Sequence, residues 1–268
     1  MKIQLFSDLH LEHSHRHPPF VLPATSADVV VLAGDIDNGT RAIDWAEKTF
    51  PDRTVLYVPG NHEYYDAELK TAAAALRARA RRSANVQVLD NDELTIDGVR
   101  FLGSTLWTDF ELFGREKMDT AMSKSLKYVV DFRKIRMGDD LLTPRQTIDL
   151  HREAIAFLQA RLEEPFAGRT VVITHHAPHP GSVHPRWTGD LTTADFIDAA
   201  SKVVGVAAAA TMLEALTPNY AMAQQVAPDD KRIKGTWETY DSPNGTGKIK
   251  GYLVRPATAT GKLPGILV

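Results

Sequence analysis

Short apolar runs recur through the first two thirds of the chain, and each is about as long as one strand of a sheet. The runs cover residues 2–6, 28–33, 54–58 and 170–174. Near-continuous apolar strands, without polar alternation, are typical of a sheet that is covered on both faces. We therefore expect these four runs to form buried strands.

Helical patterns lie between the apolar runs. Residues 67–82 are rich in Ala, Leu and Arg, and residues 143–162 carry apolar positions at helical spacing after a Thr-Pro start that suits a helix N-terminus. Within residues 86–107, Asp97-Gly98 lies between two alternating runs, which is a hairpin signal. Together these patterns predict an α/β fold with an antiparallel element.

The last quarter of the chain has a different pattern. An apolar stretch, residues 203–213, is too short to cross a bilayer, and we expect it to form a helix that is buried or that docks in a groove. Strand-like runs follow at residues 235–240, 249–254 and 263–268, separated by turn residues. The first residues of the chain do not resemble a signal peptide, so a cytoplasmic protein is the expectation.

Composition narrows the chemistry. The 268 residues are 43% hydrophobic and 24% charged, as in ordinary globular proteins. There is no Cys, which excludes disulfides, thiolate metal sites and cysteine nucleophiles, so any metal must be bound by His, Asp, Glu or Asn. The net charge of −3 offers no basic patch for nucleic acid or for an anionic membrane surface.

Polar residues that can bind metal follow each of the four predicted strands. Because the carboxyl ends of strands meet at one crevice of an open α/β sheet, we expect these residues to converge. Carboxylate and imidazole donors together suit Mn, Fe or Zn, and a shared carboxylate can bridge two ions about 3.5 to 4 Å apart around a phosphoryl group. The motifs are Asp8-Leu9-His10, Gly34-Asp35, Gly60-Asn61-His62-Glu63 and His175-His176.

Each motif by itself has a simpler explanation. Asp8 and Asp35 could cap helices, His10 could be a loop residue, and Asn61 could hold a turn. Four such motifs at four strand ends favour the metal site. Glycine beside the ligands, as in the second and third motifs, lets the backbone turn sharply.

In order and spacing, these motifs resemble those of the calcineurin-like metallophosphoesterases, over residues 1–195. The resemblance implies a two-sheet sandwich flanked by helices, two divalent ions, and hydrolysis of small-molecule phosphate mono- or diesters through a metal-bridged hydroxide. It assigns His62 as the general acid, a role that suits the pKa of histidine. The implied ligands are Asp8 and His10 for the first metal, Asp35 as the bridge, and Asn61 and His175 for the second metal, with His176 in support.

Each of two further groups of residues has two interpretations. The remaining histidines could line the substrate entrance or be merely solvated. The aromatic segment that follows residues 99–104 could wall the pocket or pack in the core. The first group is His13, His15, His17, His179 and His184, and the second is Trp107, Asp109 and Phe110.

The chain departs from the family pattern near its end. Members of the family normally have a Gly-His-x-His motif downstream, but no His follows His184. About three protein ligands then remain for each metal, and lower metal affinity is expected.

Residues 196–268 resemble instead the N-terminal region of a dienelactone hydrolase. The motifs are Pro228-Asp-Asp-Lys-Arg-Ile-Lys234, Tyr240-Asp-Ser-Pro-Asn-Gly245 and Gly251-Tyr-Leu-Val-Arg-Pro-Ala257, and no Gly-x-Ser-x-Gly elbow accompanies them. We interpret the chain as a fusion of two domains, 1–195 and 196–268. The strands of the second could replace missing phosphoesterase strands, or pair between chains and make a homo-oligomer.

Three functions compete at this point. The leading hypothesis is a metal-dependent phosphoesterase whose activity is reduced by the missing ligands. The second is a non-catalytic module that binds metal or a partner, suggested by the missing motif. The third is a carboxylesterase, suggested only by the resemblance of residues 196–268.

Overall fold

The computed structural model describes residues 1–16, 26–178, 189–197, 233–241 and 248–256. The chain divides into two compact units, Met1–Ala210 and Thr211–Val268, which are described separately. The domain boundary near residue 195 stays a prediction.

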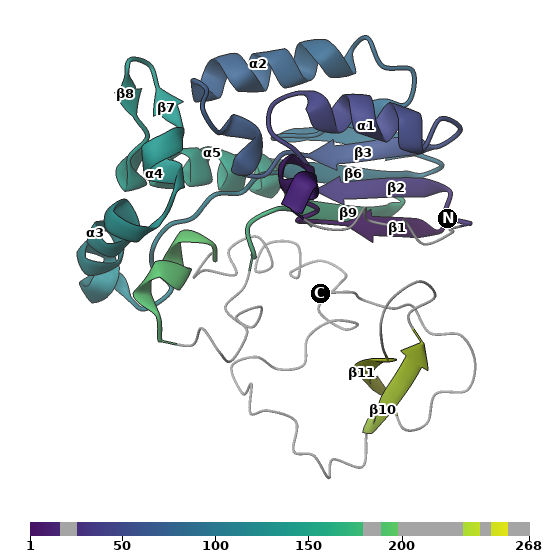
Figure 1. The fold of residues 1–268 in the computed structure, drawn as a ribbon. Helices are drawn as coiled ribbons and strands as arrows, with labels where there is room; N and C mark the ends of the chain where they lie inside the picture. Colours follow the sequence, from purple (N-terminus) through teal and green to yellow (C-terminus); the bar gives the residue numbers. More distant parts are fainter. Residues whose placement is uncertain (17–25, 179–188, 198–232, 242–247, 257–268) are drawn as a thin grey trace. The chain divides into compact units, whose positions relative to one another are not determined.

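The first unit contains a sheet of four parallel strands, which includes three of the four predicted ones. Side chains of β2 point alternately to the two faces: Val30 and Leu32 join one apolar cluster, whereas Val29 and Val31 join another. Helices α1 and α2 pack on the first of these faces (Figure 1). In spatial order the strands are β1 (Ile3–Phe6), β2 (Val29–Ala33), β3 (Thr54–Val58) and β4 (Val86–Val88), and the helices are α1 (Arg41–Thr49) and α2 (Leu69–Ala80).

A second sheet packs on the other face of the first through Phe101 and Ile173. Its hairpin turns at Asp97 and Gly98, whose φ values of 48° and 73° fit the predicted two-residue turn. Its outer face is covered by α5, so two sheets lie between helices, as predicted. The elements are β5 (Asp92–Ile96), antiparallel to β6 (Val99–Ser104), then β9 (Arg169–Thr174), parallel to β6, and α5 (Pro144–Glu163).

The N-terminus of α5 is fixed by its own sequence. The Thr143 side chain accepts a hydrogen bond from the backbone N–H of Gln146, and the Gln146 side chain accepts one from the backbone N–H of Thr143. Pro144 occupies the first turn, where its missing N–H costs nothing. The predicted start of this helix is therefore confirmed.

Several short elements were not predicted. The apolar pattern of α3 is weak because its buried face consists of Ala121, Met122 and Ser125. The others are too short to show a period. They are α3 (Met118–Tyr128), α4 (Asp131–Lys134), the hairpin β7 (Arg136–Met137) and β8 (Asp140–Leu141), and the 3₁₀ turns η1 (Leu11–Arg16), η2 (His62–Tyr64), η3 (Arg115–Lys117) and η6 (Leu191–Asp195).

The expectation of strands buried on both faces holds for β2 and β3 and is wrong for β1 and β9. Ile3 and Leu5 on β1 are 43% and 40% exposed, and Val172 on β9 is 37% exposed. Among the described strands, β1 and β9 lie at the edges of their sheets. An apolar run alone does not distinguish an edge strand from a central one.

The described part of the second unit is an antiparallel pair, β10 (Ile233–Asp241) and β11 (Lys248–Pro256). These strands contain the predicted runs 235–240 and 249–254. The predicted helix at 203–213 and the run 263–268 lie outside the described residues. Within the described ranges, no helix combines the length and apolarity that a membrane span requires.

Candidate metal centre

The carboxyl ends of β1, β2, β3 and β9 meet at one cavity, as predicted. This cavity has a volume of about 430 Å³. All five predicted ligands and the predicted general acid line it: Asp8, His10, Asp35, Asn61, His62 and His175.

The loops that carry three of these residues have an unusual backbone. Asp8, His10 and Asp35 have φ values of 54°, 47° and 54°, in the left-handed region that non-glycine residues rarely adopt. The two loops hold each other, because the N–H of Asp8 donates to the Gly34 carbonyl and the N–H of His10 donates to the Asp35 carbonyl, both at 3.0 Å. Strained backbone of this kind persists where the surrounding structure fixes it, commonly at functional sites.

Two glycines let the strand ends approach closely. A Cβ on Gly34 would overlap the His175 ring, and a Cβ on Gly60 would overlap Asp35 Oδ1. Gly34 also has a φ of 88°, so it meets the expectation of a sharp turn. At Gly60 the reason is space for the neighbouring ligands.

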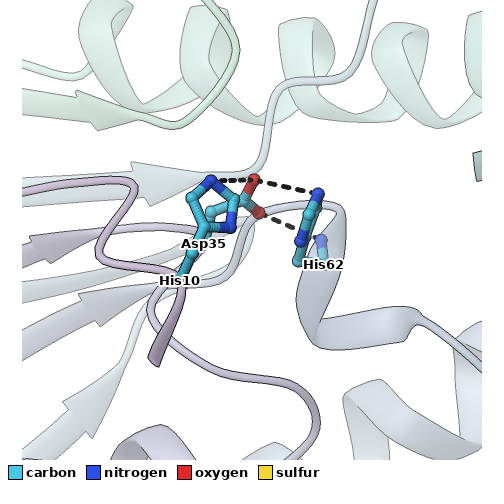
Figure 2. Close-up of side chains that lie close together, drawn as sticks. All are labelled: His10, Asp35 and His62. Atoms are coloured by element: carbon cyan, nitrogen blue, oxygen red, sulfur yellow. Dashed lines mark hydrogen bonds and ion pairs between the residues drawn. The ribbon is translucent and has the colours of Figure 1, made fainter. Parts of the chain in front are cut away.

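The Asp35 carboxylate lies in the middle of the cluster. Its Oδ2 is 3.9 Å from His10 Nε2 and 3.7 Å from His62 Nε2, and Figure 2 shows the carboxylate between these two rings. Its Oδ1 is 3.5 Å from His175 Nε2 and accepts a hydrogen bond from the backbone N–H of His62 at 3.0 Å. One carboxylate therefore faces donor atoms on two flanks.

On one flank, His175 Nε2 lies 3.0 Å from Asn61 Oδ1. His175 Nδ1 donates to the Ala33 carbonyl at 2.9 Å, so in the neutral ring the lone pair is on Nε2 and faces the Asn61 oxygen. Burial lowers the pKa of His175, but the charge of Asp35 and the hydrogen bond to Ala33 raise it above the ordinary value overall. A divalent cation is complementary to this set of atoms, so the residues fit the expected metal.

Asp131 sets the orientation of the Asn61 amide. Its Oδ1 accepts from Asn61 Nδ2 at 2.9 Å and from the Tyr65 hydroxyl at 2.7 Å. Burial, the largest effect, raises the pKa of Asp131. Sequence reasoning missed this residue, because nothing in the sequence links it to an Asn seventy positions earlier.

The Glu63 carboxylate holds together the loop that carries Asp35 and the loop that carries Gly60. The fully buried carboxylate accepts from the backbone N–H groups of Asp35, Ile36 and Gly60 at 3.1, 2.9 and 2.8 Å, and from the Tyr57 hydroxyl at 2.5 Å. Burial, then the charge of Asp35, raises the pKa of Glu63. Sequence reasoning gave Glu63 no role of its own, although its place in the Gly60-Asn61-His62-Glu63 motif is a signal that could have found it.

The other flank of Asp35 is more open. Asp8 Oδ1 lies 3.8 Å from His10 Nε2, and the Asp8 side chain is 59% exposed. Among the residues that the structure describes, two sets of donor atoms lie close enough to hold an ion: His10, Asp35 and His62, and Asp8, Asp35 and His175. The structure thus brings His62 to ligand distance as well, beyond the role that the resemblance implies.

Glu12, which was not predicted, also belongs to the open flank. Its Oε1 accepts from His62 Nδ1 at 2.9 Å and from His10 Nδ1 at 3.2 Å. Burial raises the pKa of Glu12, but hydrogen bonds to His62, to the backbone and to His10 outweigh it, so the pKa lies below its ordinary value. The carboxylate is ionised at neutral pH.

His176 points away from the cluster. It is buried, its Nδ1 donates to the Thr105 carbonyl at 3.0 Å, and its ring stacks on Trp107 with 5.4 Å between centroids. Burial, with the nearby His175 second, lowers the pKa of His176 to about 3, so the ring is neutral. Its position beside His175 suits a supporting role.

The cavity wall differs from the segment singled out in the sequence. Trp107, Asp109 and Phe110 are buried and do not line the cavity, so for these residues the packing interpretation holds. His13 is half exposed, with Nε2 3.9 Å from Glu12 Oε1. The side chains of His15, His17, His179 and His184 lie outside the described part. The wall consists of Tyr65, Tyr128, Val129, Val130, Thr192 and Phe196, which sequence reasoning missed.

Two known proteins are similar to this chain in sequence. A 60-residue segment is 47% identical to the putative hydrolase fragment YghX of Escherichia coli K12, and it spans 22% of this chain and about half (51%) of that relative. Over 200 residues the chain is 27% identical to the uncharacterized protein L509 of Acanthamoeba polyphaga mimivirus. This aligned region covers 66% of this chain and 68% of L509.

Among solved structures, the phosphopantetheinyl hydrolase PptH of Mycobacterium tuberculosis has a similar fold, with a TM-score of 0.54 at 19% identity over 78% of each chain. The resemblance of residues 196–268 to a dienelactone hydrolase stays a prediction. The model of the calcineurin-like phosphoesterase family matches residues 1–209, which is most of the chain. The chain belongs to the calcineurin-like phosphoesterase family.

Proposed function

We propose that this protein is a metal-dependent phosphoesterase that hydrolyses phosphate mono- or diesters of small molecules and uses two divalent ions such as Mn, Fe or Zn. The observation that carries the proposal is the position of the Asp35 carboxylate, with one oxygen toward His10 and His62 and the other toward His175. A carboxylate so placed can be shared by two ions.

The ligands and the general acid have separate roles in this proposal. Asp8 and His10 would hold one ion, Asn61 and His175 the other, and Asp35 both. When bound, the ions would activate water and neutralise charge on the phosphoryl oxygens. His62 lines the cavity, and its ring is stacked on Tyr65 with 4.1 Å between centroids. In its protonated form it would donate the Nε2 proton to the leaving-group oxygen.

A second role for His62 has its own support. Its Nε2 lies in one donor set with His10 and Asp35, so it could replace one of the family's missing histidine ligands. Substitution of His62 distinguishes the two roles. The metal content per chain should fall if His62 is a ligand and should stay unchanged if it is only a general acid. With about three ligands for each ion, we expect weaker metal binding than in relatives that keep the final motif.

The test uses the full chain. Metal content per chain is measured beside hydrolysis of bis-p-nitrophenyl phosphate and p-nitrophenyl phosphate, before chelation, after chelation and after addition of Mn²⁺. Two metals per chain and turnover that chelation abolishes and Mn²⁺ restores are the expected results. Asp35→Asn should lose both, whereas the matched control Asp119→Asn, at a side chain that is 87% exposed, should keep both.

The other hypotheses give different results. Bound metal without turnover of either ester would contradict the proposal and favour a metal-binding module. Hydrolysis of p-nitrophenyl acetate that survives chelation would indicate a carboxylesterase. Association through residues 196–268 stays a prediction, which the molecular mass in light scattering tests.

A further inference from the structure

The Glu12 carboxylate connects two histidines that are fifty residues apart in the sequence. Its Oε1 accepts from Nδ1 of His62 at 2.9 Å and from Nδ1 of His10 at 3.2 Å. The Glu12 side chain is only 8% exposed, so water competes little for these hydrogen bonds. No other described carboxylate has a contact with either Nδ1 atom.

The position of Glu12 is set by the backbone around it. Glu12 lies in η1, which starts directly after His10, and the N–H of Leu11 donates to the Ile36 carbonyl at 2.9 Å. The N–H of His13 donates to the His10 carbonyl at 2.9 Å and closes the turn. Backbone hydrogen bonds therefore hold this turn against the loop that carries Asp35, and they fix the position of Glu12 relative to that loop.

These hydrogen bonds select one tautomer of each ring. An ionised carboxylate can only accept, so each Nδ1 must carry a hydrogen. In a neutral ring, Nε2 then has the lone pair, and in both rings Nε2 faces Asp35 Oδ2, at 3.9 Å for His10 and 3.7 Å for His62. A ring flip or the other tautomer would lose the hydrogen bond to Glu12.

We propose that Glu12 is a positioning residue that holds the rings of His10 and His62 with both Nε2 atoms directed at Asp35. The consequence for catalysis rests on the proposed function, but the orientation of the rings does not. One carboxylate thereby aligns a metal ligand and the general acid together. The neutral His10 ring directs its Nε2 lone pair toward a metal, whereas the His62 ring acts as an acid in its protonated form, in which Nδ1 stays on Glu12 and Nε2 carries the hydrogen to be donated. Oε2 of Glu12 has no hydrogen-bond partner among the described residues, so Oε1 is the atom that holds both imidazoles.

The first test does not depend on activity. Imidazole ¹⁵N NMR of the metal-free full chain reports which nitrogen of each histidine is protonated. In the wild type, His10 and His62 should both carry the Nδ1 hydrogen, and Glu12→Ala should shift both rings toward a mixture of tautomers. Glu12→Gln keeps an acceptor and should lie between the two. If both rings keep the Nδ1 hydrogen in Glu12→Ala, the proposal is wrong.

The second test separates positioning of the acid from a general structural role. A diester with an alkoxide leaving group needs protonation, whereas p-nitrophenolate leaves without it. We expect Glu12→Ala to lower kcat about 100-fold for the alkyl ester and only a few-fold for the p-nitrophenyl ester, with KM nearly unchanged. Equal losses for both esters would contradict the role in proton donation.

A matched control and the metal content complete the design. Glu93→Gln, on the exposed side of β5, should leave tautomers, metal content and both rates unchanged. Glu12→Ala should also bind the metal at His10 about 10-fold more weakly. If the wild type shows no turnover that depends on metal, the proposed function fails, but the NMR result still decides whether Glu12 sets the ring orientation.

Discussion

The two flanks of Asp35 present similar donor atoms but differ in burial and support. On one flank, Asn61 is 4% exposed and the His175 side chain 8%. On the other, the side chains of Asp8 and His10 are 59% and 31% exposed. The buried flank is held by Asp131 and by the Ala33 carbonyl, whereas Glu12 is the group that holds His10 on the open flank.

This difference in burial and support indicates how the centre keeps its shape before metal binds. The buried ligands are oriented by fixed hydrogen bonds, so little side-chain entropy remains to be lost on binding. The open ligands retain more freedom but lie on strained backbone. We therefore expect the ion between Asn61 and His175 to bind more tightly than the ion beside Asp8 and His10.

The largest expected effect comes from His62, which stands beside the open flank. His62→Gln should lower kcat for an alkyl phosphodiester about 100- to 10,000-fold, because proton transfer to the leaving group is lost. Metal content should remain at the wild-type value. A loss of one metal per chain would show instead that His62 is a ligand.

A smaller effect is expected on the buried flank. Asp131→Ala removes the acceptor that orients Asn61, and the affinity of one metal should fall about 10- to 100-fold while the other ion is retained. Titration of the metal-free chain with Mn²⁺ measures both sites. Asp139→Ala, at an exposed position nearby in sequence, should bind metal like the wild type. Equal weakening of both sites would remove the distinction between the flanks.

Asp195, whose electrostatics depend on the same Asp131, carries an electrostatic cost. Burial, with the charge of Asp131 second, raises the pKa of Asp195 well above its ordinary value of 3.8, and its Oδ2 has no hydrogen-bond partner among the described residues. The native state therefore binds this proton more tightly than the unfolded state. The contribution to stability is full below pH 3.8 and is lost as pH rises through the raised pKa.

Asp195→Asn replaces the buried, ionisable carboxyl group by a neutral amide. The free energy of unfolding at pH 7 should therefore rise by about 1 to 3 kcal/mol, and it should decline less as pH rises. Urea unfolding between pH 4 and 8 is the measurement. Asp190→Asn is the control, because an amide still caps η6 and the Asp190 carboxylate is not buried. A variant that is less stable than the wild type at pH 7 would contradict the expectation.

The smallest effect is expected at His13. This ring is half exposed and only 3.9 Å from Glu12 Oε1, so the ion pair is weak. His13→Ala should change kcat and metal content by less than about twofold. The Nδ1 hydrogens of His10 and His62 should remain visible in the NMR spectrum as in the wild type. A larger change would add a third ring to those that Glu12 holds.

Much of the fold could be predicted because strong local signals agree with the tertiary structure. Residues 54–58 form a strand with the predicted bounds, the Thr143-Pro144 start caps α5, and Asp97-Gly98 turns the hairpin. The edge positions of β1 and β9 and the weak pattern of α3 could not be predicted, since they depend on which elements pack against them. The same reason explains why Trp107 and Phe110 lie in the core while Tyr128 and Phe196 line the cavity.

The donor atoms of the centre and the strand ends that carry them follow from the amino-acid sequence, because chain order and strand direction bring these motifs to one edge of the sheets. How the donors are held depends on tertiary packing. Asp131 lies seventy residues from Asn61, and Glu12 lies fifty from His62. Hydrogen bonds across such separations depend on how the loops pack, and no local pattern of residues encodes them.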